Sequence, residues 1–274
     1  MSVRLGVLAL ALAWAPAALA RDITFTGTFM QGGLVVVQAP GATAATLDTR
    51  SLNVAADGTF VFGLAPDAKS EVQVVLRYAD GTRETQTLSV ARQNWKVERV
   101  NGLPPETVNP PPAIQQRINA ENAKISKARA DSAQALWFLS GFDWPVTGRI
   151  SGVFGSRRML NGQEGAPHWG LDVAAPTGTP IRAPAPGRVV LAEPDFYLSG
   201  GTVILDHGYG VSSSYSHMSK VTVKPGDELK QGDVLGAVGA TGRVTGPHLH
   251  WTLNWYATRI DPALVVPPMP TTGG

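Results

Sequence analysis

The sequence contains no cysteine among its 274 residues. That absence excludes a disulfide scaffold, a thiol nucleophile and a thiolate metal site. The sequence also lacks a large excess of charge of either sign, because its 23 Lys and Arg residues nearly balance its 21 Asp and Glu residues, for a formal net charge of +2. So small an excess, without a basic run, argues against nucleic-acid binding. The 30 glycines and 21 prolines favour short strands joined by turns over a helical bundle.

Long hydrophobic runs are missing too, apart from one at the N-terminus. Residues 5–15 (LGVLALALAWA) follow the positive charge of Arg4 and precede Ala-Leu-Ala at 18–20, which is the order of a secretory signal peptide. The alternative is an uncleaved membrane anchor, which would need roughly 20 apolar residues, more than this run offers. We therefore expect residues 1–20 to be a cleaved signal peptide. The mature protein is expected to be periplasmic or secreted, with no stable membrane insertion.

Residues 21–92 consist of short alternating runs, such as ITFTGTF and EVQVVLRY, with turn pairs at Asp57-Gly58 and Asp80-Gly81 between them. Alternation of period two with Asp-Gly turns predicts a small antiparallel β-sandwich of the immunoglobulin-like kind. The segment holds no cluster of titratable or ligand residues. A docking or spacer module is the favoured interpretation.

Residues 93–143 are expected to form a linker and one surface helix. The linker ends in three prolines at 110–112, and proline suits the first turn of a helix. Beyond them, Ile118 and Ile125 belong to a narrow apolar stripe among Gln, Arg, Glu and Lys, which fits a helix resting on one domain better than a coiled coil. Residues 266–274 offer little to bury, so they are expected to be a disordered tail.

All five histidines lie in residues 144–265, a segment rich in Gly, Pro and Val that is expected to fold as an all-β domain of antiparallel sheet. The spacing His168-x-x-x-Asp172 places an imidazole and a carboxylate on the same face of an extended segment. His248-Leu-His250 does the same for two imidazoles. Two histidines and a carboxylate, with no sulfur, suit a Zn²⁺ ion that keeps a fourth position open for water.

The segment from 144 to 262 resembles the lysostaphin/LytM-type zinc metallopeptidases, which cut peptidoglycan cross-bridges. Four stretches carry the resemblance in order and spacing: GRISGVFGSRR (148–158), HWGLDVAAPTGTPIRAPAPGRVV (168–190), GTVILDHGYGVSSSYSHMS (201–219) and VKPGDELKQGDVLGAVGATGRVTGPHLHW (223–251). The resemblance covers somewhat under half of the chain. The whole arrangement also resembles exported peptidases of Gram-negative bacteria that carry an added β domain ahead of the catalytic one.

This resemblance implies that His168, Asp172 and His250 are the zinc ligands. It also implies that His217, in the Tyr-x-His motif, and His248 line the cleft and serve catalysis by proton transfer and stabilisation of the tetrahedral intermediate. Which of these two histidines is the general base stays open.

The fifth histidine, His207, matches an Asp-His-Gly turn that is no ligand in the family, so a structural role is expected. Two departures from the family pattern are modest. Thr252 stands where the family often has Glu, and Met218 replaces the usual Leu. All three ligand positions are intact, which matters because relatives that have lost them act as activators of other wall hydrolases.

The function predicted is therefore that of an exported zinc-dependent endopeptidase that hydrolyses peptide cross-links of peptidoglycan through a metal-activated water. An alternative from another class is a non-hydrolytic or autoinhibited cell-wall binding or activator protein of the same fold, in which the module or the helix covers the site. A third hypothesis is a zinc enzyme that cuts a non-wall substrate, such as a glycine-rich protein. The bond cut, the oligomeric state and any protein partner stay open.

Overall fold

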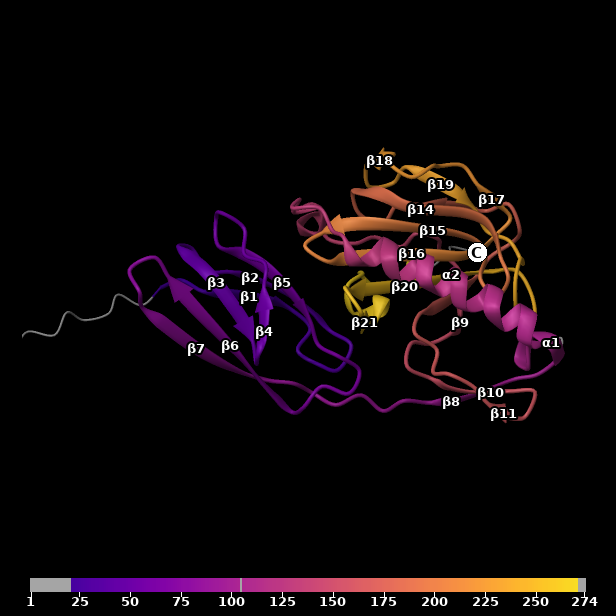
Figure 1. The fold of residues 1–274 in the computed structure, drawn as a ribbon, viewed down its shortest axis with the longest axis horizontal. Helices are drawn as coiled ribbons and strands as arrows, with labels where there is room; N and C mark the ends of the chain where they lie inside the picture. Colours follow the sequence, from indigo (N-terminus) through magenta and orange to yellow (C-terminus); the bar gives the residue numbers. More distant parts are fainter. Residues whose placement is uncertain (1–20, 104, 271–274) are drawn as a thin grey trace, which may run out of the picture.

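The computed structural model of the chain describes residues 21–103 and 105–270. The predicted signal peptide, residues 1–20, lies outside the described residues. Within the described ranges, no helix combines the length and apolar character that crossing a bilayer requires. Antiparallel sheets make up most of the structure, which confirms the predicted fold class (Figure 1).

Residues 21–92, here called the N-terminal β module, form two sheets with the strand orders β1-β2-β5 and β4-β3-β6-β7. The strands are β1 (Thr24–Gly27), β2 (Leu34–Gln38), β3 (Ala42–Leu47), β4 (Arg50–Leu52), β5 (Thr59–Gly63), β6 (Glu71–Tyr78) and β7 (Arg83–Ser89). Along β6, Val72, Val74 and Leu76 are buried, whereas Glu71 and Gln73 are exposed. This alternation gives the module one apolar interior.

Residues 144–265, here called the C-terminal β domain, are built on one large sheet of order β18-β14-β15-β16-β20-β12-β9, with β21 beside β20. A smaller sheet has the order β13-β19-β17. The strands are β9 (Arg149–Gly152), β12 (Leu171–Ala174), β13 (Pro180–Arg182), β14 (Gly187–Phe196), β15 (Gly200–Gly208), β16 (Val211–Met218), β17 (Lys220–Val221), β18 (Glu228–Leu229), β19 (Val234–Ala237), β20 (His248–Trp255) and β21 (Thr258–Ile260).

The two faces of β20 differ in character, one being apolar and the other polar. Leu249, Trp251 and Leu253 are fully buried on one face, and the first two pack between the sheets with Val173 and Leu235. The opposite face carries the polar side chains of the strand, including both histidines. The apolar layer beneath the strand therefore holds the polar layer above it in place.

The segment between the two β units crosses the face of the large sheet. It contains β8 (Val97–Val100), α1 (Pro105–Val108), α2 (Pro112–Ala130) and the short helix η1 (Trp137–Ser140). Strand β8 pairs in parallel with β10 (Arg157–Leu160), which pairs in turn with β11 (Gln163–Glu164). Helix α2 lies over β14 and its neighbours (Figure 1). The connector thus brings its own residues to the sheet that carries the histidines.

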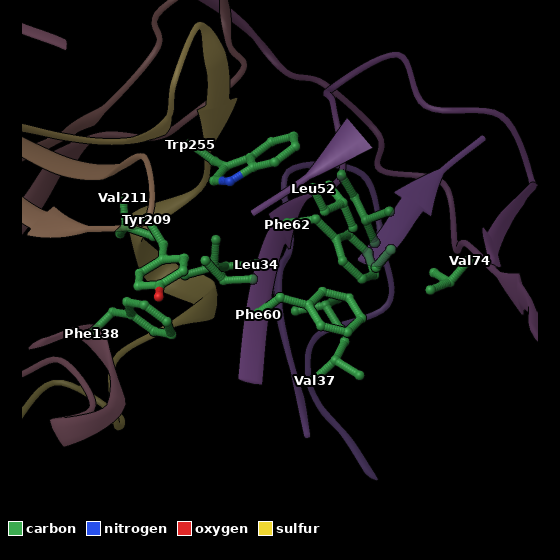
Figure 2. Packing of buried hydrophobic residues seen from close by; sticks show 14 of the residues in the cluster. Leu34, Val37, Leu52, Phe60, Phe62, Val74, Phe138, Tyr209, Val211 and Trp255 are labelled. Atoms are coloured by element: carbon green, nitrogen blue, oxygen red, sulfur yellow. The ribbon is translucent and has the colours of Figure 1, made fainter. Parts of the chain in front are cut away.

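One apolar cluster joins the module to the C-terminal β domain. Leu34 and Phe60 from the module belong to the same buried cluster as Tyr209 and Trp255 from the large sheet, and Phe138 of η1 lies beside Tyr209 in that cluster (Figure 2). Phe60 is fully buried and Trp255 is 2% exposed. The two units therefore share a core instead of being joined only by a tether.

The expected disordered tail, residues 266–274, is described only as far as residue 270. Val266 and Met269 pack against the cluster between the two sheets of the C-terminal β domain. Trp144 donates a hydrogen bond from Nε1 to the carbonyl of Pro267 at 2.8 Å. Residues 266–269 therefore have apolar and polar partners in the C-terminal β domain.

Candidate active site

His168, Asp172 and His250 bring three ligand atoms to one point. Asp172 in β12 lies directly opposite His250 in β20 in the antiparallel register. His168 precedes β12 outside any strand, and its backbone pairs with the turn at Gly155 and Ser156. His168 Nε2 lies 3.0 Å from Asp172 Oδ1 and 2.9 Å from His250 Nδ1, while His250 Nδ1 lies 2.8 Å from Asp172 Oδ1.

The protons available to these three atoms fit a cation site. His168 Nδ1 donates to the carbonyl of Val153 at 3.0 Å, which leaves a lone pair on Nε2. Asp172 Oδ1 offers only lone pairs when ionised, and His250 Nδ1 can bring at most one proton. The three facing atoms therefore hold more lone pairs than protons, which is the arrangement that a divalent cation satisfies.

Asp172 is kept as an anion by its partners. Burial alone would raise the pKa of its carboxyl group, but hydrogen bonds to His168 and His250 outweigh burial and hold that pKa well below its usual range. Arg158 Nη2 donates to the second oxygen, Oδ2, at 2.5 Å. Gly152 makes room for this oxygen, because a Cβ there would lie 2.3 Å from it.

His217 reaches the site through a distorted backbone. Ser216 faces His250 in the register of β16 and β20, so a regular strand would turn His217 to the other side. The backbone φ of His217 is +65°, which is uncommon for a non-glycine residue. Its ring centroid lies 4.8 Å from that of His248 and 5.9 Å from that of His250.

In both His217 and His248, Nδ1 lies beside a backbone carbonyl and Nε2 is the other ring nitrogen. The Nδ1 atom of His217 lies 2.8 Å from the carbonyl of Thr241, and that of His248 lies 2.8 Å from the carbonyl of Gly246. Donation from Nδ1 leaves Nε2 as the free atom in each ring. His248 Nε2 lies 3.8 Å from Asp172 Oδ1. Burial, followed by the charges of His250 and His248, lowers the pKa of His217 to about 3, so this ring is neutral at pH 7.

His207 is held away from the site, inside the protein. Its Nδ1 donates to the carbonyl of Pro186 at 2.7 Å, and its Nε2 accepts from Ser213 Oγ at 2.7 Å. The hydroxyl of Tyr215 lies 2.6 Å from Ser213 Oγ and completes the chain. Phe142 stacks edge-on against the His207 ring at 5.2 Å. With both ring nitrogens used, His207 has no free atom for a ligand.

A cavity of about 340 Å³, here called the cleft, opens beside His168 and His250. Its lining includes His168, His217 and His250 together with Arg158, Asn122 of α2 and Arg259 of β21. Of the five histidines, four meet here, because His248 contacts both His217 and Asp172.

Arg158 and its partner Glu98 are site residues that the sequence interpretation did not single out. Glu98 Oε1 accepts from the backbone N–H of Val153, and Glu98 Oε2 lies 3.8 Å from Arg158 Nε. Arg158 ends the first stretch that resembles the metallopeptidases, so its place in that stretch was an available signal. Glu98 offered none, because it reaches the site only through the parallel pairing of β8 with β10.

Comparison with known proteins places this site in a family. The model of peptidase family M23 matches residues 166–262. The chain is 34% identical over 169 residues to the cell division protein DipM of Caulobacter vibrioides, covering 58% of this chain and 26% of DipM. It is 42% identical over 106 residues to the peptidoglycan DD-endopeptidase ShyA of Vibrio cholerae, covering 38% of this chain and 24% of ShyA. The match thus spans about a quarter of each of these relatives.

A crystal structure of a Pseudomonas aeruginosa protein assigned to peptidase M23 is similar over most of both chains. The identity is 32%, the TM-score is 0.66, and the match covers 86% of this chain and 94% of the other. The similarity therefore includes the N-terminal β module and the connector, as well as the segment matched by the family model. The chain belongs to peptidase family M23.

Proposed function

We propose that this protein is an exported, zinc-dependent endopeptidase that hydrolyses peptide cross-links of peptidoglycan. Residues 144–265 are the proposed peptidase unit, and the proposal of export rests on the predicted signal peptide at 1–20. The name of ShyA, a peptidoglycan DD-endopeptidase, supports the substrate class. The observation that carries the proposal is the meeting of His168 Nε2, Asp172 Oδ1 and His250 Nδ1 with more lone pairs than protons among them.

His168, Asp172 and His250 would hold the zinc ion in this proposal. A zinc ion bound by two imidazoles and a carboxylate polarises a carbonyl and lowers the pKa of a water molecule to roughly 7. Arg158 holds the free oxygen of Asp172, and Val153 holds the ring of His168 through its carbonyl. These outer contacts orient the ligand atoms before any ion arrives.

His217 and His248 are the proposed catalytic residues. Each has its Nδ1 proton directed to a carbonyl, so Nε2 is the atom that can accept a proton from water and return it to the leaving amine. Once protonated, either ring can also stabilise negative charge on the scissile carbonyl oxygen. The neutral state of His217 in the protein is the one that a proton acceptor requires.

The experiment is digestion of purified cross-linked peptidoglycan by the mature protein, with products identified by mass spectrometry. Loss of cross-linked dimers, abolished by a chelator and restored by Zn²⁺, is the expected result, and the product masses name the bond. An Asp172→Asn variant serves as the metal-site control and is expected to retain little zinc. Zinc-loaded protein that consumes no dimers would refute hydrolysis by the intact chain and leave the autoinhibited or non-hydrolytic alternatives.

A second candidate, an autoinhibited peptidase, is favoured by the position of α2. The helix lies on the same side of the large sheet as the site, where Arg129 donates to Ser214 Oγ at 2.7 Å and Asn122 lines the cleft. A cross-linked substrate running along that side of the sheet would meet the helix. In this case the chain hydrolyses peptidoglycan only when α2 is displaced.

A further inference from the structure

A second hollow adjoins the catalytic cleft and is lined by three arginines. Its volume is about 410 Å³, and its lining includes Arg50 of β4, Arg129 of α2, Arg259 of β21, Asn254 and Tyr256. We call this hollow the arginine pocket. Arg259 lines both the arginine pocket and the cleft that holds His217 and His250. The two hollows are therefore neighbours that share one side chain.

The strand register places Arg259 on the catalytic side of the sheet. His250, Thr252 and Asn254 alternate along β20 and so face the same side. Asn254 lies opposite Arg259 in the antiparallel pairing of β20 with β21. A polar track thus runs from the ligand atom on His250 to the arginine pocket. A peptide bound at the cleft could extend along it.

The charges of the arginine pocket lack a counter-ion. No carboxylate lines the pocket, and within the described ranges neither Arg129 nor Arg259 forms an ion pair. Arg129 Nη2 donates to Ser214 Oγ, but its Nε is buried without a hydrogen-bond partner. Burial, and then the charge of Arg259, lowers the pKa of Arg129 to about 9. Two guanidinium groups that are partly withdrawn from water and repel each other are stabilised by an anion between them.

The N-terminal β module contributes the third arginine in a fixed position. The guanidinium of Arg50 lies 3.8 Å from the centre of the Trp255 ring and 5.2 Å from that of Tyr256. Such stacking holds the group in place without neutralising its charge. The module therefore has a residue at the edge of the arginine pocket, besides its share of the common core.

We propose that Arg259 and Arg129 bind a free carboxylate of the substrate peptide, so that the enzyme selects anionic peptides. This inference rests on the proposed peptidase function and names the substrate feature that the cleft alone does not select. A guanidinium group binds a carboxylate through two parallel hydrogen bonds, which gives both charge and direction. A peptide carboxylate fits better than a free anion such as phosphate, because the arginine pocket opens beside the cleft and shares Arg259 with it.

The first test compares two substrates that differ only in the anion. One is a synthetic cross-linked peptide with a D-alanyl bond and free carboxylates, and the other is its twin with every carboxyl group amidated. We expect the zinc-loaded protein to prefer the acid. Arg259→Gln should raise KM for the acid by about ten-fold or more and remove the preference for the acid over the amide. Arg259→Lys should recover part of the loss, and Arg83→Gln, on the exposed strand β7, is the matched control.

The second test measures binding without hydrolysis. The measurement is the fluorescence anisotropy of the labelled acid and amide peptides with protein from which a chelator has removed the metal. The protein should bind the acid more tightly than the amide, and this preference should be lost in Arg259→Gln and in Arg129→Gln. A preference for the acid without hydrolysis by zinc-loaded protein would keep the carboxylate site and remove the peptidase. Hydrolysis of both peptides without any preference for the acid would overturn the carboxylate site alone. So would displacement of the labelled peptides by inorganic phosphate if the protein binds the acid and the amide equally well. Melting temperatures show whether each variant is folded.

Discussion

Four of the five histidines place Nδ1 beside a backbone carbonyl. The partners are Val153 for His168, Pro186 for His207, Thr241 for His217 and Gly246 for His248. Each contact fixes the proton on Nδ1 and leaves Nε2 to its surroundings. Nε2 of His207 meets a serine, that of His168 meets Asp172, and those of His217 and His248 stay free for proton transfer. In the proposed function, these backbone contacts present Nε2 of His168 to the metal ion and Nε2 of His217 and His248 to the transferred proton, while His207 supports the fold.

At this scale, removing the His217 ring should separate catalysis from metal binding. Asparagine tolerates the positive φ of His217, so His217→Asn removes the imidazole with little backbone strain. We expect zinc content to stay at that of the native protein while hydrolysis falls by about 10²- to 10⁴-fold. Zinc per chain by mass spectrometry and the rate of dimer loss are the measurements. His250→Asn is the contrasting variant and should lose zinc. Loss of zinc from His217→Asn would assign this ring to the metal instead.

The buried His207 predicts how stability depends on pH. Burial lowers its pKa to about 4, below the ordinary value near 6.5. Between these pH values the unfolded chain binds a proton that the folded chain does not, so the free energy of unfolding falls as the pH decreases through that window. The contribution of His207 is about 2 kcal/mol between pH 7 and pH 5. Urea unfolding of the native protein and of His207→Gln at both pH values measures it. The variant should be less stable at pH 7 and depend less on pH, and equal slopes would contradict the assignment.

At the scale of elements, helix α2 is held mainly by polar contacts. Ile118 is its only buried residue within the described part of the helix. Lys124 Nζ lies 2.8 Å from Glu193 Oε1, and Arg117 Nη2 lies 3.2 Å from Asp195 Oδ2. Both ion pairs are solvent-exposed, and such pairs contribute little to stability. Breaking them should loosen the helix without unfolding the sheet below.

The autoinhibited candidate predicts that loosening α2 raises activity. The double substitution Arg117→Gln and Lys124→Gln should increase hydrolysis of cross-linked peptidoglycan by about two- to five-fold, because weaker contacts raise the population of molecules with α2 displaced. Raised salt should do the same to the native protein, because it screens exposed pairs. Lys127→Gln, on the same helix, is the matched control. Unchanged activity in the double variant would show that α2 does not restrict the substrate.

Local sequence patterns were sufficient to predict the strands and the helix, but insufficient to predict which strands pair with one another. Alternation and Asp-Gly turns predicted the antiparallel sheets, and the fold class is confirmed because such signals act within a few residues. The pairing of β8 with β10 joins residues about 60 positions apart and carries no local signal. The position of the His217 ring depends on the positive backbone φ of this residue, which the neighbouring sequence does not predict. The family is confirmed, whereas the roles of the five site residues stay predictions until zinc and activity are measured.

At the scale of the whole molecule, the shared core couples the module to the catalytic sheet. Phe60 of the module and Trp255 of β20 belong to one buried cluster (Figure 2). Trp255 follows the histidines on the same strand and stacks with Arg50 of the module. A module that packs on the strand carrying the ligand atoms should unfold together with it, as one cooperative unit.

The prediction is that a cavity made inside the module destabilises the catalytic sheet. Phe60→Ala should lower the free energy of unfolding by about 3–5 kcal/mol, because it empties a fully buried ring position. Calorimetry should show a single transition that moves to lower temperature, with zinc release and loss of hydrolysis at that same temperature. Leu88→Ala, at a half-buried position on β7 that packs against the same cluster, is the milder control and should shift the same transition less. Two transitions, with zinc release staying at its native temperature, would mean that the two units fold independently and that the module acts on the site only through Arg50.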